Sequence, residues 1–148
     1  MLDREKEARQ KSRAIKSNGY FHLIHSRNEM ECFWWWKWLW KIQCPLKSKL
    51  YCWFLFSRKA LTWDNLCQRG REGPGRCYLC NMDSETNAHT GFECSFTRRV
   101  WSEIEVKLRY NNLWNGLTIL DCVQNWVLHA EARYRSLPVI VSWFIWKA

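Results

Sequence analysis

Residues 77–94 read CYLCNMDSETNAHTGFEC and hold four side chains of the types that bind soft metal ions in proteins. Two residues separate Cys77 from Cys80, four separate His89 from Cys94, and eight lie between the two pairs. A tight Cys-x2-Cys turn brings both thiolates to the same side, and an imidazole with a third thiolate completes a tetrahedral shell. This spacing predicts a Cys3His zinc site.

Such a shell leaves no position for water, so the predicted zinc is structural and not hydrolytic. Chance or a redox motif could produce part of the same pattern. A chain with eight cysteines sometimes contains a Cys-x2-Cys by coincidence. A redox Cys-x2-Cys normally follows a strand in a βαβ pattern, and the sequence lacks that pattern.

The remaining cysteines and histidines have no second partner at ligand spacing. We expect the cysteines to be small core residues, with Cys67 as the one plausible substitute ligand, and the histidines to lie in packing or surface positions. These residues are Cys32, Cys44, Cys52, Cys67, Cys122, His22, His25 and His129.

The segments on either side of the cysteine cluster have helical patterns. After Pro45, Leu46, Leu50, Trp53 and Phe54 form one apolar stripe, which predicts a helix to about Ser57 with Trp53 in the core. Thr62 as N-cap and Gly70 beyond the C-terminus predict a short helix over 63–69, followed by a glycine-rich loop. Further helices are predicted from three apolar patterns: Phe96, Val100, Ile104 and Leu108, ending near 111–112; Leu117, Leu120, Val123 and Val127; and the segment that Pro138 opens.

The predicted fold is therefore mostly α: a small helical domain organised around a Cys-Cys-His-Cys zinc knuckle. We expect a loosely ordered polar leader at 1–30, the zinc-binding domain at 31–110 and a helical extension at 111–148. The stripes at 46–54 and 96–108 are expected to pack on each other. Six aromatic residues fall within 33–40, too many to face one core, so some of them must be exposed or covered by a partner.

Positive charge is concentrated in one part of the chain. Of the net charge of +9, residues 37–76 carry +7, residues 1–36 carry +2 and residues 77–148 are balanced. Cations interleaved with Trp and Tyr suit a polyanion with stackable bases. The alternative is a solvated helix face on which long cationic stems cover aromatic neighbours.

Length and composition exclude several classes of protein. A chain of 148 residues with 47% apolar and 25% charged residues has the length and composition of a single globular domain. Its longest apolar run, over 137–146, is too short to span a membrane and contains a proline and a serine. No hydrophobic stretch follows the first seven residues, so we expect an intracellular chain whose thiols are free or bound to metal.

Taken together, these motifs resemble the zinc-binding domain of plant reverse transcriptases, which lies downstream of the polymerase in non-LTR retrotransposon proteins. The resemblance covers about residues 31–108. It rests on Pro45–Trp53, Leu61–Leu66, Arg69-Gly70, Gly73-Pro74, the Cys77–Cys80 turn, Glu85-Thr86 before His89, Cys94, Phe96 and Val100-Trp101.

The resemblance implies that Cys77, Cys80, His89 and Cys94 are the zinc ligands. It also implies a non-catalytic accessory module, because in that family a polymerase with paired aspartates performs the chemistry. Here every aspartate is isolated, so neither an enzyme nor a small-molecule substrate is expected.

Two functions follow from these observations. The first is binding of RNA or DNA, with Lys47, Lys49, Arg58 and Lys59 on phosphates. The second is docking on a polymerase domain through the Trp-rich segment at 33–40. A truncated copy without a selected function is a further alternative.

Overall fold

The computed structural model describes residues 34–148. The chain divides into two compact units, Met1–Lys37 and Trp38–Ala148. The polar leader expected at 1–30, with Cys32 and two of the histidines, lies outside the described residues. In the first unit, residues 34–37 are helical, and the rings of Trp35 and Trp36 meet edge to face with centroids 6.1 Å apart.

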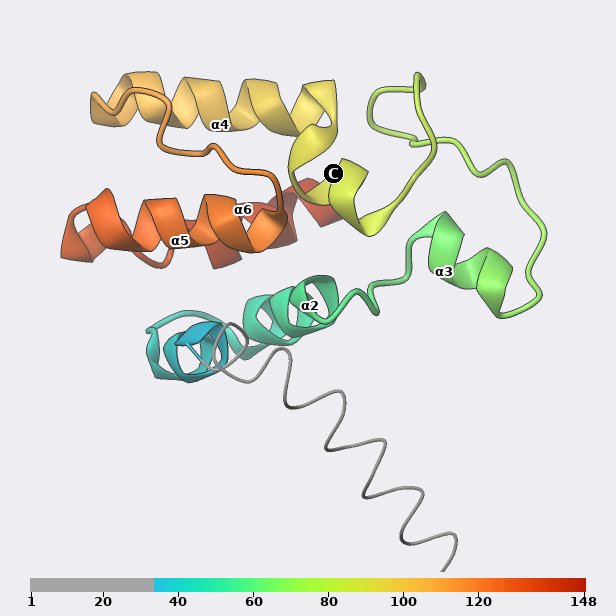
Figure 1. Cartoon of the computed structure of the whole chain (residues 1–148), viewed down its shortest axis with the longest axis horizontal. Coiled ribbons are helices and arrows are strands. Elements are labelled where there is room, and N and C mark those ends of the chain that lie inside the picture. Colours follow the sequence, from blue (N-terminus) through green and yellow to red (C-terminus); the bar gives the residue numbers. More distant parts are fainter. Residues whose placement is uncertain (1–33) are drawn as a thin grey trace, which may run out of the picture. The chain divides into compact units, whose positions relative to one another are not determined.

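The second unit is built from helices, as the sequence predicts (Figure 1). The described part of the chain contains no strand, only an isolated antiparallel bridge between Arg76 and Ser84. Its elements are α2 (Leu46–Phe56), α3 (Trp63–Gln68), the π-helical turn η1 (His89–Glu93), α4 (Ser95–Leu108), α5 (Ile119–His129), the 3-10 turn η2 (Ala132–Tyr134) and α6 (Leu137–Lys147).

An arginine in the left-handed conformation follows the last turn of both α2 and α4. Arg58 has φ 57°, and the backbone N–H groups of Arg58 and Lys59 donate to the carbonyls of Leu55 and Phe54. Arg109 has φ 60°, and the backbone N–H groups of Arg109 and Tyr110 donate to the carbonyls of Val106 and Glu105. This is the Schellman pattern, for which glycine is the usual residue. Because no glycine marks either end, the end predicted for α4 from the sequence is about three residues too late.

The prediction of which face of α2 is buried is wrong. Leu46, Leu50 and Phe54 are 61%, 41% and 42% exposed, and Trp53 is half-buried. The buried face consists of Ser48, Tyr51, Cys52, Leu55 and Phe56. Since α2 is apolar on both sides, the apolar pattern does not determine which face is buried. The packing of the partner helix determines it.

That partner is α6, and not the 96–108 helix as expected. The small side chains of Ser48 and Cys52 allow a close approach, and the Cys52 thiol donates to the carbonyl of Val139 at 3.7 Å. Pro138 lies in the first turn of α6, where its missing N–H costs nothing.

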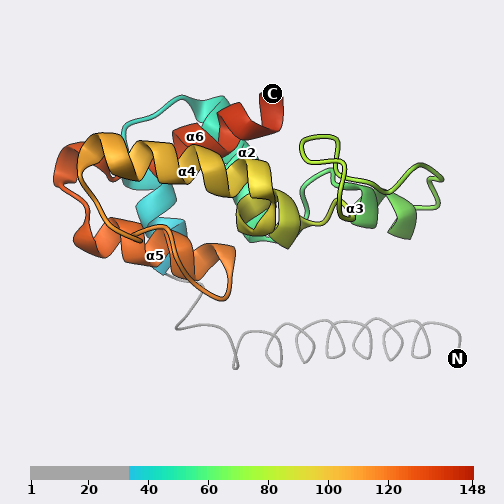
Figure 2. The ribbon, with the colours of Figure 1, turned by 90° about the horizontal axis from the view of Figure 1, so that it is seen from above.

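A tryptophan cluster packs α4 against α5. The rings of Trp101 and Trp126, both fully buried, have centroids 5.0 Å apart, and Trp114 stacks on Trp101 at 3.8 Å. The indole N–H of Trp126 donates to the carbonyl of Tyr134 at 2.8 Å. The two helices lie side by side in both views (Figure 2). In the described residues, no helix has the length and apolar character needed to cross a membrane.

Candidate metal centre

A tight turn presents the first two cysteines. The backbone N–H of Cys77 donates to the carbonyl of Asp83 at 2.8 Å, and that of Asn81 donates to the carbonyl of Cys77 at 2.8 Å. Asn81 takes a left-handed conformation with φ 56°, which asparagine tolerates better than most residues. The turn therefore closes on itself and directs both sulfur atoms toward η1.

The histidine and the third cysteine lie at the two ends of η1. The backbone N–H of His89 donates to the hydroxyl of Thr86 at 3.0 Å, and that of Cys94 donates to the carbonyl of His89 at 2.7 Å. Cys94 is also the N-cap of α4. One π-helical turn thus brings the imidazole and the thiol to the same side.

Packing fixes η1 against the helices that follow it. The buried Thr97 hydroxyl of α4 donates to the carbonyl of Thr90 at 3.0 Å. Gly91 is buried against α5, and a Cβ added there would lie 3.3 Å from Cδ1 of Ile119. A small residue at 91 lets η1 approach α5 closely, so α4 and α5 together support this half of the centre.

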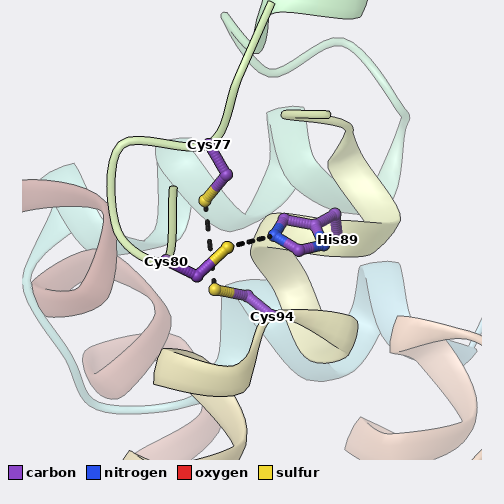
Figure 3. A group of neighbouring side chains, drawn as sticks. All are labelled: Cys77, Cys80, His89 and Cys94. Carbon is purple, nitrogen blue, oxygen red and sulfur yellow. Dashed lines mark hydrogen bonds between the residues drawn. The ribbon is translucent and has the colours of Figure 1, made fainter. Parts of the chain in front are cut away.

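Four potential ligand atoms converge between the turn and η1 (Figure 3). The sulfur atoms of Cys77 and Cys94 are 3.9 Å apart, and Cys80 Sγ is 3.3 Å from Nε2 of His89. All four ligand atoms lie within 4.8 Å of one another. In a tetrahedral zinc site with Zn–S bonds of about 2.3 Å, sulfur atoms are about 3.8 Å apart and a sulfur and a nitrogen about 3.5 Å. The arrangement fits zinc.

The two thiols of the turn have opposite electrostatic environments. The backbone N–H groups of Met82 and Asp83, with the ring of His89, lower the pKa of Cys80 to about 6. Burial raises the pKa of Cys77 to about 11. The N–H of Met82 lies 3.5 Å from Cys80 Sγ, and backbone donors of this kind stabilise a thiolate ligand.

The donor set also decides what the centre can do. Three soft sulfur atoms and one imidazole nitrogen favour zinc over calcium or magnesium. Three of the four residues are buried, and Cys80 is half-buried. Four protein ligands fill a tetrahedral shell, so a metal bound by all of them stabilises the fold and has no open position for a substrate.

The other cysteines that the structure describes are not part of this group. Cys67 is exposed on α3 and is not among the grouped ligands, and Cys44 is half-buried, so the expectation that all of them are core residues is wrong for these two. Cys52 and Cys122 are buried as predicted. Burial raises the pKa of both thiols, which makes them unreactive.

The predicted phosphate-binding residues are brought to the surface around α2. Lys47, Arg58 and Lys59 are exposed, while Lys49 is half-buried and donates from Nζ to the carbonyl of Trp40 at 3.3 Å. No acidic residue occurs from 37 to 63. The positive charge of this segment is therefore not neutralised by acids of its own sequence.

One residue of the centre was not foreseen from the sequence. Tyr78 lies between the two cysteines of the turn, and its hydroxyl donates to the carbonyl of Trp146 in α6 at 2.9 Å. The partner is 68 residues away, so no local pattern could reveal it.

The comparison with protein families gives one match. A family model described as zinc-binding in reverse transcriptase matches residues 16–101. The match confirms the family resemblance of the sequence motifs, begins earlier than the expected residue 31, and contains all four grouped ligands. No curated protein and no solved structure matches the chain.

Proposed function

The chain belongs to the family of zinc-binding domains in reverse transcriptases, and we propose that it is a non-catalytic module that binds nucleic acid. In this proposal, Cys77, Cys80, His89 and Cys94 hold one zinc ion. Lys47, Lys49, Arg58 and Lys59 contact phosphates. The convergence of three thiols and one imidazole within 4.8 Å, inside the family match, is the observation that carries the zinc assignment.

The bound zinc would act as a cross-link. It would join the Cys77–Cys80 turn to both ends of η1, and through Cys94 it would reach the N-cap of α4. In the unfolded chain these ligands are far apart, so the free energy of metal binding is folding free energy. The set is closed, because four protein ligands fill a tetrahedral shell, and this supports a non-catalytic role for the metal.

The nucleic-acid proposal rests on charge and exposure. Lys47, Arg58 and Lys59 project from α2 and the residues just after it, and no acidic residue lies between 37 and 63. Lysines provide point charges rather than a planar fork, so binding should show little sequence preference.

A salt titration of the triple variant Lys47→Gln, Lys49→Gln, Lys59→Gln tests this proposal. We expect weaker binding of single-stranded RNA and DNA alike, and a salt slope flattened by about 0.7 for each lost phosphate contact. A matched triple variant of exposed cations in the balanced region, Arg99→Gln, Lys107→Gln, Arg135→Gln, should bind like the wild type. An unchanged affinity and slope in the α2 variant would show that the basic face is only solvated.

Protein docking is the second candidate function, and the exposed side of α2 favours it. Leu46 and Leu50 are 61% and 41% exposed, and neither has a ring on which a base could stack. An apolar stripe at i, i+4 and i+8, completed by Phe54, suits a groove on a protein such as the associated polymerase. Docking through this stripe would be nearly insensitive to salt, so the same titration separates the two functions.

A further inference from the structure

The knuckle, α2 and α6 meet around two tyrosines. Tyr78 lies in the Cys77–Cys80 turn, and Tyr51 lies on the buried face of α2. Trp143 and Trp146, from the last turns of α6, contact Tyr51 through their rings. The fold thus joins the metal centre to a helix pair that the family match covers only in part, since that match ends at residue 101.

The Tyr78 hydroxyl bonds to the last turn of α6. The carbonyl of Trp146 lies in this turn. The Tyr78 hydroxyl donates to this carbonyl at 2.9 Å. A side chain of the knuckle is therefore hydrogen-bonded to the backbone of α6.

The last turns of α6, where Tyr78 bonds, also pack against α2. The ring of Trp146 stacks on Tyr51 with centroids 5.3 Å apart and an angle of 28° between the planes. The ring of Trp143 meets Tyr51 edge-on at 5.9 Å. Tyr51 is buried, so any shift of the last turn of α6 changes the packing against α2.

We propose that Tyr78 couples zinc loading of the knuckle to the seating of α6 on α2. This inference rests on the zinc assignment proposed above and not on nucleic-acid binding. With metal bound, the ligands on either side of Tyr78 are fixed, and its hydroxyl is held at the Trp146 carbonyl. Without metal, the turn loses its link to His89 and Cys94, and the bond from Tyr78 to Trp146 is lost with it. Tyr78 is a positioning residue in this scheme, because it does not touch the metal.

Hydrogen exchange of backbone amides in residues 142–148 tests the coupling, with zinc content measured on the same samples. In the wild type, we expect a chelator to speed exchange in this segment about threefold to tenfold, as loss of one hydrogen bond implies. Tyr78→Phe should retain one zinc per chain and yet exchange, when loaded, about as fast as the chelated wild type. Tyr134→Phe, which removes a hydroxyl without a hydrogen bond in the described structure, should behave like the wild type.

Three results would overturn the coupling. Tyr78→Phe could exchange as slowly as the wild type when loaded with zinc. The chelated wild type could keep full protection at 142–148, a comparison that needs no variant. Tyr78→Phe could also lose its zinc, which would place the residue in the metal site itself. Retention of zinc by Cys80→Ser is a separate result, which would contradict the ligand assignment.

Discussion

At the scale of single residues, protons and zinc compete for the same lone pairs. A thiolate or a neutral imidazole binds the metal, so each ligand must first lose any proton it carries. Cys80 receives backbone N–H donors that lower its pKa to about 6, and the buried Cys77 has its pKa raised to about 11. At neutral pH, the Cys80 sulfur is therefore ready to bind, whereas Cys77 must release a proton when the metal enters.

Zinc affinity should fall as the pH is lowered. Between pH 8 and pH 6 the proton displaced from Cys77 should by itself weaken binding about tenfold per pH unit, so at least this loss is expected, and below pH 6 protonation of Cys80 should steepen it. Competition against a chelating dye whose own affinity is known at each pH measures this dependence. Equal affinities at pH 8 and pH 6 would contradict thiol ligation.

The grouping of the four ligands was predictable from spacing, because a Cys-x2-Cys turn and a short His-x4-Cys helical turn are both local structures. Tyr78 could not be assigned in the same way. Thr86 accepts a bond from the His89 backbone, and Tyr78 donates to Trp146 across 68 residues. The Tyr78 contact is tertiary, and the sequence pattern does not encode it, whereas the Thr86 bond is local and spans three residues.

At the scale of elements, α2 shows why a helix is easier to predict than the face it buries. The apolar spacing after Pro45 predicted its existence and nearly its length. It is apolar on two sides, however, and the exposed stripe of Leu46, Leu50 and Phe54 has the same periodicity as a core stripe. Shape decides the face, because Ser48 and Cys52 are small enough to let α6 approach.

Two leucines of α2 provide a matched test of this face. Leu55→Ala should lower the free energy of unfolding by about 2–5 kcal/mol, because Leu55 is 1% exposed and its removal leaves a cavity. Leu50→Ala, on the 41% exposed side, should cost less than about 1 kcal/mol. Urea unfolding of the zinc-loaded proteins measures both. Equal losses, or a larger loss at Leu50, would mean that the predicted stripe is the buried one after all.

At the scale of the whole molecule, the helical class and the order of the helices followed from the sequence, but their pairing did not. The α4–α5 contact is local, and Trp101, Trp114 and Trp126 are close enough in sequence to be expected together. The α2–α6 pair joins segments about 90 residues apart, as the bond from Cys52 to Val139 illustrates. Such a pairing depends on how the zinc knuckle redirects the chain between them.

The zinc content of the intact protein tests the central claim most directly. Native mass spectrometry measures the number of zinc ions per chain in the wild type, in Cys80→Ser and in the control Cys67→Ser. The thiol of Cys67 is exposed and lies outside the ligand group. We predict one zinc in the wild type and in Cys67→Ser, and loss of zinc from Cys80→Ser. Full retention of zinc by Cys80→Ser, or its loss from Cys67→Ser, would contradict the assignment of the knuckle.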